Sequence, residues 1–230
     1  MLPCSPRRAR LQPGHAALSP GRARLQPGHG LLLALTAAVM RSVHRIIEMH
    51  AATNGDAPAV IDAATSCSYR ELNAAANALA RKLIAGGLRR GMRVQVSMPP
   101  SPDLAAFLLA ILKAGGCYTW NDSDPAAASL RIEESPGEWR DVDISDNAVA
   151  GLVSGPNLPV VARETDIACV LDREEGDRAV AVPHATIISM ANCVADAHTP
   201  WVGESGAFDL WAALMNGATA VVTQRPAVAA

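Results

Sequence analysis

Lysine is scarce in this 230-residue sequence, since Lys82 and Lys113 are the two lysines among its 20 basic residues. A mechanism that sets a lysine against a phosphate or an acyl group must therefore use one of them. The sequence also lacks an excess of charge, because 22 acidic residues bring the formal net charge to -2. This balance gives no electrostatic footprint for nucleic acid or for an anionic membrane, so neither is predicted as a partner.

Paired cysteines are missing as well. No CxxC pair occurs and the number of cysteines is odd, which argues against a disulfide framework and against a zinc site of the usual spacing. The five cysteines are Cys4, Cys67, Cys117, Cys169 and Cys193. We interpret them as small core residues of a cytoplasmic protein. Apolar residues make up 50% of the chain, and its length suffices for one large domain or two small ones.

The first forty residues are predicted to be a disordered extension. Residues 5–15 and 19–29 repeat the same eleven-residue pattern, with Arg7 against Gly21 as the one difference. Two copies are too few for a solenoid, and the segment is rich in Pro, Gly and Arg and contains no acidic residue. Its composition is therefore typical of disorder.

The apolar run from Gly30 to Val39 has two interpretations. It resembles the core of a signal peptide, although it is too short to span a bilayer as a helix. The alternative is a tandem duplication upstream of the native start at Met40, and the cytoplasmic character of the later residues favours it. We therefore expect a folded domain over residues 41–223 and a short tail over residues 224–230.

Hydrophobic periodicity predicts an α/β fold for the folded part. Helices are expected at 43–52, 69–85, 103–114, 185–197 and 208–216, and strands at 59–61, 94–98, 117–120, 167–171, 179–182 and 219–222. Ser68 and Glu71 have the capping-box spacing, and residues 121–160 carry weak signals apart from turns such as Pro136-Gly137. Alternating strands and helices predict a parallel-type sheet flanked by helices on both faces.

Four stretches in the expected order resemble the adenylation domains of nonribosomal peptide synthetases, within the adenylate-forming (AMP-dependent synthetase/ligase) superfamily. They are residues 43–60, CSYRELNAAANALARKL at 67–83, SPDLAAFLLAILKAGGCYTWNDSDP at 101–125 and ALMNGATAVV at 213–222. The second resembles the family pattern LTYxELNxxANxLAxxL. This resemblance implies the N-terminal subdomain of the adenylate-forming fold, in an incomplete form. The stretches build helices and strands, so function has to be argued from the sites.

The resemblance places the family's ATP loop, YTSGSTGxPKG, after the strand at 167–171. Small residues in such a loop let backbone N–H groups close around phosphate oxygens, and the lysine adds positive charge. The residues found there are Asp172, Arg173, Glu174, Glu175, Gly176, Asp177 and Arg178. This loop is about three residues shorter, has one glycine, no lysine and four carboxylates, and is predicted to be a degenerate phosphate loop.

Two like charges about 4 Å apart cost roughly 4 kcal/mol near a protein surface, so a carboxylate-lined loop repels the phosphates of ATP unless magnesium intervenes. The four carboxylates are either new magnesium ligands or a solvated charged turn. We favour the solvated turn, which is the commoner arrangement.

The family's substrate motif, FDxSxxExW, corresponds to residues 203–211. Its aspartate holds the substrate's α-amino group, and Glu204 takes that position, which predicts a vestigial substrate-binding residue. The phenylalanine before it is replaced by Gly203, and Trp211 is expected in the core.

Trp120 replaces a family proline. His184 follows the loop as in relatives and is expected to be structural, and His44 and His50 are spaced for no shared metal site.

The family's later motifs have no match in the sequence. These are YGPTE, which stacks on adenine, the TGD aspartate, which holds the ribose, the hinge and the C-terminal subdomain with its lysine. Neither Lys82 nor Lys113 matches a family catalytic position. We therefore expect no catalytic residue, no metal and no cofactor in this chain, although the family uses ATP and magnesium to make an aminoacyl-AMP for transfer to a carrier protein.

Three interpretations of the sequence remain open. The chain is a truncated adenylation domain that is inactive alone, a scaffold that docks a peptide synthetase, a carrier protein or an associated partner, or half of a split enzyme. A scaffold would use an exposed apolar face, also for self-association, and the apolar helices around Leu104 to Leu112 and Phe208 to Met215 would supply it.

Overall fold

The computed structural model describes residues 42–63, 65–121, 129–142, 155–159, 162–171, 179–191, 198–201 and 207–223. The predicted extension at 1–40 and the tail at 224–230 lie outside these ranges. The helices of the described part are α2 (Val43–Thr53), α3 (Tyr69–Ala85), α4 (Pro102–Lys113), α5 (His184–Ala191) and α6 (Phe208–Met215). No helix in these ranges is long and apolar enough to cross a bilayer.

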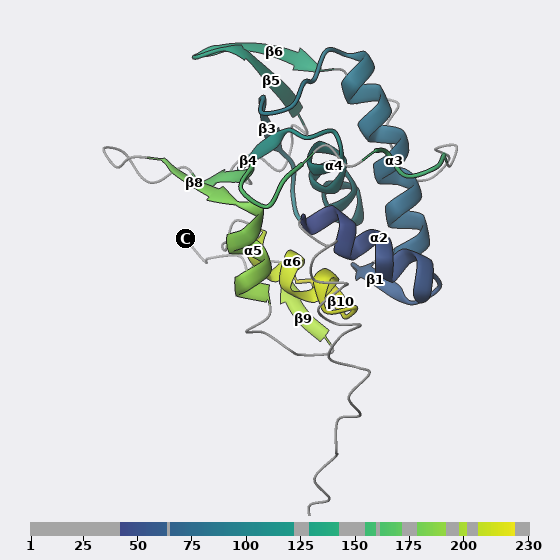
Figure 1. The fold of residues 1–230 in the computed structure, drawn as a ribbon. Coiled ribbons are helices and arrows are strands. Elements are labelled where there is room, and N and C mark those ends of the chain that lie inside the picture. The colour runs from purple at the N-terminus through teal and green to yellow at the C-terminus, as the bar shows by residue number, and fades with distance from the viewer. Residues whose placement is uncertain are drawn as a thin grey trace, which may run out of the picture. The chain divides into compact units, whose positions relative to one another are not determined.

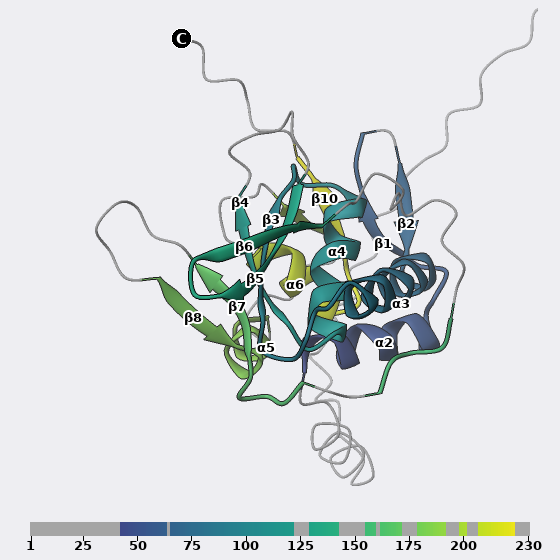
Figure 2. The same cartoon turned by 90° about the horizontal axis from the view of Figure 1, so that it is seen from above.

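The strands form two sheets (Figures 1 and 2). Their bounds are β1 (Pro58–Ile61), β2 (Ser66–Ser68), β3 (Arg93–Ser97), β4 (Cys117–Asn121), β5 (Ser129–Ser135), β6 (Glu138–Val142), β7 (Ile167–Leu171), β8 (Val180–Pro183), β9 (His198–Trp201) and β10 (Thr219–Val222). One sheet has the order β6-β5-β3-β4-β7-β8 and the other β2-β1-β10-β9.

The α/β class is confirmed, and both sheets are mixed rather than purely parallel. Strands β3, β4 and β7 are parallel neighbours, as are β1, β10 and β9. Antiparallel partners flank these parallel cores, with β5, β6 and β8 in the larger sheet and β2 in the smaller one. Short connections account for the antiparallel pairs of consecutive strands, β1–β2, β5–β6 and β7–β8, because a parallel crossover needs a dozen or more residues. Strand β5 also pairs antiparallel with β3, which is not its neighbour in the chain.

Helix α3 begins where its sequence predicts. The Ser68 hydroxyl accepts a hydrogen bond from the Glu71 backbone N–H at 3.3 Å, and the Glu71 carboxylate accepts one from the Ser68 N–H at 2.8 Å. This is the predicted capping box, which satisfies two N–H groups that a helix start leaves without partners. The helix ends before Gly86 and Gly87, and Gly87 adopts a φ of 98° that favours glycine.

Helix α4 lies in the middle of the hydrophobic core. Ser101 caps its start by accepting a hydrogen bond from the Leu104 N–H at 3.1 Å, and Pro102 occupies the first turn. All side chains from Leu104 to Leu112 are at most 3% exposed. Figure 1 shows α3 on one side of α4 and β3 and β4 on the other. The pattern of apolar residues all round this helix indicates such burial.

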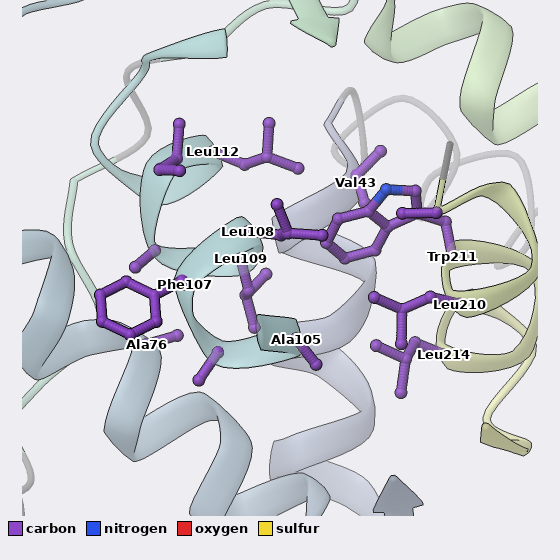
Figure 3. Close-up of a cluster of buried hydrophobic side chains, with 14 of the residues drawn as sticks. Val43, Ala76, Ala105, Phe107, Leu108, Leu109, Leu112, Leu210, Trp211 and Leu214 are labelled. Carbon is purple, nitrogen blue, oxygen red and sulfur yellow. The ribbon is translucent and has the colours of Figure 1, made fainter. Parts of the chain in front are cut away.

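The core cluster joins α4 to its helical neighbours. Phe107 and Ala76 meet on the α3 side of α4, and Leu210, Trp211 and Leu214 of α6 lie on the opposite side (Figure 3). Within α6, residues 210–215 are buried. The prediction that these two apolar helices supply an exposed docking face is therefore wrong, because their apolar side chains are already used inside the domain.

The hairpin of β5 and β6 was not predicted. It turns at Pro136-Gly137, where Gly137 has a φ of 83°, and it buries Leu130 and Ile132 against the core. On its more exposed face Arg93 of β3 pairs with Glu133 at 2.9 Å. A strand with two buried residues and mostly polar neighbours carries little periodic signal, which is why the sequence showed only the turn.

An extended segment, residues 155–159, lies along α3. Asn73 and Asn77 both donate their side-chain amides to the Asn157 side-chain oxygen at 2.9 Å, and Arg81 donates to the Pro156 carbonyl. These donors are spaced four residues apart on one helix face. The contacts fix the course of the chain shortly before it enters β7.

The C-terminal end of α6 is held by side chains of α2 and α3. The buried Tyr69 hydroxyl lies 3.0 Å from the Leu214 carbonyl oxygen and 2.7 Å from that of Ala218. His50 Nε2 lies 2.9 Å from the Met215 carbonyl oxygen. Because the last carbonyls of a helix have no partners within it, these two side chains close α6 and connect it to the N-terminal half of the domain.

Replacing Tyr69 by phenylalanine should therefore destabilise the protein by about 1–3 kcal/mol, because the Ala218 carbonyl loses the buried hydroxyl that donates to it while the ring is kept. The free energy of unfolding in urea measures the loss. The control is Ile84→Ala, since Ile84 is exposed and should change stability by about 0.5 kcal/mol or less. Equal stability of Tyr69→Phe and the parent protein would contradict this role.

Candidate functional site

The hairpin of β7 and β8 flanks the predicted phosphate loop. The two strands are antiparallel neighbours, with Leu171 at the end of β7 opposite Val180 at the start of β8. Residues 172–178, from Asp172 to Arg178, lie outside the described ranges. Their predicted role as a degenerate phosphate loop therefore stays a prediction, while the strands that lead into and out of it are placed as the resemblance implies.

The base of this hairpin is tied to the rest of the large sheet. Arg90 pairs with Asp166 at 2.7 Å, and the same carboxylate accepts a hydrogen bond from the Arg163 N–H at 2.8 Å. The Asp166 carbonyl accepts a bond from the His184 N–H at 3.1 Å. Partial burial favours a higher pKa for Asp166, but the hydrogen bonds from Arg163 and Arg90 outweigh it and lower the pKa. Asp166 is thus a structural anion beneath the hairpin.

Two buried histidines meet where α2 and α5 begin. The rings of His44 and His184 lie edge to face with centroids 6.1 Å apart. The Val43 backbone N–H donates to His184 Nδ1 at 3.3 Å, so the neutral ring carries its proton on Nε2. Burial lowers the pKa of His184 to about 4, and burial together with His184 lowers that of His44 to about 3. Both rings are neutral at pH 7, which suits the structural role expected for His184.

No metal site emerges in the described ranges, since they contain no group of three or more His, Cys, Asp or Glu side chains able to hold an ion. His50, the other histidine of α2, contacts the end of α6 instead. Cys67, Cys117 and Cys169 are buried free thiols, as core cysteines would be.

Lys113 forms a buried ion pair rather than an open cationic site. Its side chain is 0% exposed at the end of α4, and its Nζ lies 2.5 Å from Glu48 Oε1 of α2. Glu48 also pairs with Arg45 at 2.9 Å. Burial lowers the pKa of Lys113, and the attraction of Glu48 opposes that shift. Lys82 lies exposed in the last turn of α3. Lys113 therefore has a structural role in the core.

Tryptophans occupy the end of β4 and the end of β9. Trp120 donates its indole N–H to the Met98 carbonyl at 2.9 Å, and its ring lies 5.9 Å from that of the fully buried Trp201. Tyr118, also on β4, accepts a hydrogen bond from Trp211 at 2.6 Å. Trp211 is in the core, as expected, and Trp120 replaces the family's proline with a ring that bridges the two sheets.

The predicted substrate-binding residue, Glu204, lies outside the described ranges, so its role remains untested. The first described residue after it is Ala207, which is buried and has a left-handed φ of 70° before α6 begins. Sequence reasoning missed the pairing of Lys113 with Glu48. The available signal was Lys113 itself, a charge that directly follows the apolar run from Leu104 to Leu112, because a charge in such a place needs a buried partner.

The chain has recognisable relatives. Residues 47–132 match the family described as AMP-binding enzyme. Tyrocidine synthase 3 of Brevibacillus parabrevis is 29% identical over 84% of this chain, which spans 4% of that protein. Bacitracin synthase 1 of Bacillus licheniformis is 27% identical over 82% of this chain and 4% of its own length. The chain thus spans a small part of the peptide synthetases that it matches.

Solved structures share the fold. The N-terminal subdomain of Klebsiella oxytoca NpsA, in complex with 3-hydroxyanthranilyl-AMSN, superposes with a TM-score of 0.65 at 20% identity, over 80% of this chain and 53% of that one. The nonribosomal peptide synthetase FmoA3 gives a TM-score of 0.61 at 21% identity, over 79% of this chain and 22% of its own. The chain is therefore similar in sequence to nonribosomal peptide synthetases and has the fold of an adenylation-domain N-terminal subdomain.

The buried ion pair predicts an asymmetric mutational response. Glu48→Leu alone should cost about 3–5 kcal/mol, because Lys113 is left buried and without its carboxylate. The double variant Glu48→Leu/Lys113→Met replaces the pair by apolar side chains and should recover most of that loss. Urea unfolding of the parent, single and double variants measures it, and a double variant no more stable than Glu48→Leu would rule out this pairing.

The two buried histidines predict a fall in stability at mildly acidic pH. The pKa is depressed from the ordinary 6.5 to about 3 for His44 and to about 4 for His184. Between these depressed values and 6.5, the unfolded chain therefore binds more protons than the folded protein. Stability is therefore full above pH 6.5 and falls below it, by up to about 1.4 kcal/mol per pH unit for each histidine.

Urea unfolding at pH 7, 6 and 5 measures this slope above the range in which carboxylates titrate. His184→Asn keeps an acceptor for the Val43 N–H and removes one titrating group, so its slope should be about half that of the parent. An unchanged slope in His184→Asn would show that other groups cause the pH dependence.

Proposed function

We propose that this chain, a homologue of the N-terminal subdomain of peptide synthetase adenylation domains, keeps that fold without forming an aminoacyl-adenylate by itself. The ancestral reaction joins an amino acid and ATP into aminoacyl-AMP and pyrophosphate. Negative charge builds up on the phosphates in its transition state. Positively charged groups directed at those phosphates are needed to stabilise it.

The main support for this proposal is the amino-acid composition of the loop between β7 and β8. Residues 172–178 contain four carboxylates, one glycine and no lysine, where the resembled family has small residues and a lysine. The lysines elsewhere do not supply the missing charge, because Lys113 is buried in an ion pair with Glu48 and Lys82 belongs to the last turn of α3. A phosphate approaching this loop would meet like charge.

The ends of the parallel strands give independent support. In open α/β sheets, ligands bind in the crevice beyond the carboxyl ends of the strands. Here the ends of β4 and β9 carry Trp120 and Trp201, whose rings pack together at 5.9 Å. Bulky indoles at this place suit a packed interior better than a pocket for a polar amino acid.

A folded domain without its ancestral chemistry is suited to binding another protein. As the second candidate we propose a cytoplasmic scaffold that docks a peptide synthetase or its carrier protein. The intact hydrophobic core around α4 favours it, since decay without use would be expected to reach core positions as well as the loop. A split enzyme, completed by a second chain, would need a functional phosphate loop, and the acidic loop counts against it.

The test uses the full chain in two assays, a thermal melt with millimolar magnesium-ATP and amino-acid-dependent exchange of pyrophosphate into ATP. A nucleotide present at 100 times its dissociation constant adds about 2.7 kcal/mol of stability, which a melt resolves. We expect no shift and no exchange. Exchange would overturn the proposal, and a clear upward shift without exchange would overturn its premise that the acidic loop excludes the nucleotide.

A loop-replacement variant serves as the positive control. Exchanging residues 172–178 for the loop of the family pattern, YTSGSTGxPKG, restores the small residues and the lysine. The proposal expects a magnesium-ATP shift in this variant. Failure of the variant to gain a shift, while the parent also shows none, would mean that the loop is not what excludes the nucleotide.

A further inference from the structure

The dipeptide Asn-Gly occurs twice in the sequence, at Asn54-Gly55 and at Asn216-Gly217. In such a dipeptide the backbone nitrogen of the glycine can attack the side-chain amide of the asparagine, because glycine has no side chain to hinder ring closure. Both asparagines are exposed, and each directly follows a helix, Asn54 after α2 and Asn216 after α6. The two sites therefore differ in their hydrogen bonds rather than in their access to water.

Hydrogen bonds hold both reacting groups at Asn216. Its side-chain Nδ2 donates to the Ala191 carbonyl at 2.8 Å and to the Ala212 carbonyl at 2.9 Å. The nitrogen that would attack, that of Gly217, donates to the Leu214 carbonyl at 3.4 Å. Turning the side-chain amide toward Gly217 would break the two bonds of Nδ2, which has a cost in free energy. Asn216 is thus restrained against ring closure.

The Asn54 site lacks these restraints. Within the ranges that the structure describes, neither the Asn54 side-chain amide nor the Gly55 N–H donates a hydrogen bond. The Asn54 N–H does donate, to the His50 carbonyl at 2.8 Å, so ring closure requires only that the end of α2 opens locally, as helix ends commonly do. Glycine is required at position 55, because a Cβ there would lie 2.5 Å from the Ala51 carbonyl oxygen. The fold therefore keeps this dipeptide and leaves its reacting groups unrestrained.

We propose that Asn54 is a site of spontaneous deamidation in the folded protein and that Asn216 is protected from it. The Gly55 nitrogen attacks Asn54 Cγ, and a C–N bond forms while Nδ2 leaves as ammonia with the Gly55 amide proton. The product is a cyclic imide. Water opens this ring at Cγ to give aspartate, or at the backbone carbonyl carbon to give isoaspartate. Either product adds one negative charge to the formal -2 of the chain.

The modification acts on α3 through the turn between α2 and β1 (Figure 1). The Gly55 carbonyl accepts a hydrogen bond from the Arg70 N–H at 2.8 Å, and the Ala57 carbonyl accepts one from the Tyr69 N–H at 3.0 Å. These bonds satisfy two N–H groups at the start of α3. Isoaspartate lengthens the main chain by a methylene group just before Gly55, which displaces the Gly55 carbonyl from Arg70. Deamidation of Asn54 therefore loosens the first turn of α3.

Ageing of the full chain at mildly alkaline pH tests the proposal, because base removes the Gly55 amide proton and promotes ring closure. After tryptic digestion, Asn54 is the one asparagine in the peptide of residues 46–70, and fragment ions identify Asn216 within its own peptide. In the folded protein, Asn54 should react at least about tenfold faster than Asn216, because two hydrogen bonds hold the Asn216 amide. In urea, where the fold is lost, the two should react at similar rates.

The variant Asn54→Gln is the matched control, since it keeps an amide whose ring closure needs a larger and slower-forming ring. Ageing should lower the melting temperature of the parent and speed amide hydrogen exchange at residues 69–71, and it should change neither in Asn54→Gln. The proposed site is overturned if Asn54 stays intact in the folded protein or if Asn216 reacts as fast. An equal difference in rate in urea would overturn the role of the fold, and an unchanged melt of the deamidated parent would overturn the effect on α3.

Discussion

The enclosure of α4 is the constraint on which the rest of this structure depends. A helix that is apolar all round has to be covered on every side, and here α2, α3 and the strands β1 and β4 pack against it, with side chains of α6 on a further side (Figure 3). Burying each large aliphatic side chain contributes roughly 1.5–3 kcal/mol, so this one helix organises much of the driving force for folding. The need to cover α4 determines where the surrounding elements lie. Helix α6, which is distant in sequence, is held in its place by the contacts of Tyr69 and His50 with its C-terminal end.

The same enclosure determines how the protein treats its buried polar groups. Lys113 ends α4 inside the core and is tolerated because Glu48 of α2 meets it there. His44 and His184 remain uncharged, since burial disfavours their protonated forms. These groups stabilise helix positions and are not available for chemistry. An adenylate-forming centre asks for the opposite arrangement, with cations left open toward the phosphates.

Much of the fold could be predicted from the sequence where local signals are strong. The capping box at Ser68, the proline-led start of α4 and the apolar strand β7 each have a local cause, and the structure has them close to the expected residues. The β5–β6 hairpin was not predicted because its two buried residues, Leu130 and Ile132, are isolated among charged residues. Contacts such as Lys113 with Glu48 arise from packing of distant segments, which a single sequence does not encode locally. The roles of the residues around Asp172 and Glu204 were inferred from the family resemblance and remain predictions.

The contact between Trp120 and Trp201 has an optical consequence. Trp120 belongs to β4 of the larger sheet and Trp201 to β9 of the smaller one, so their ring contact joins the two sheets. Excitation energy passes readily between indoles at such close range, and Trp201 is fully shielded from water. A separation of the sheets would expose this ring to water and uncouple the pair. The contact between the two sheets thus contributes to the fluorescence of the protein, beside that of Trp139 and Trp211.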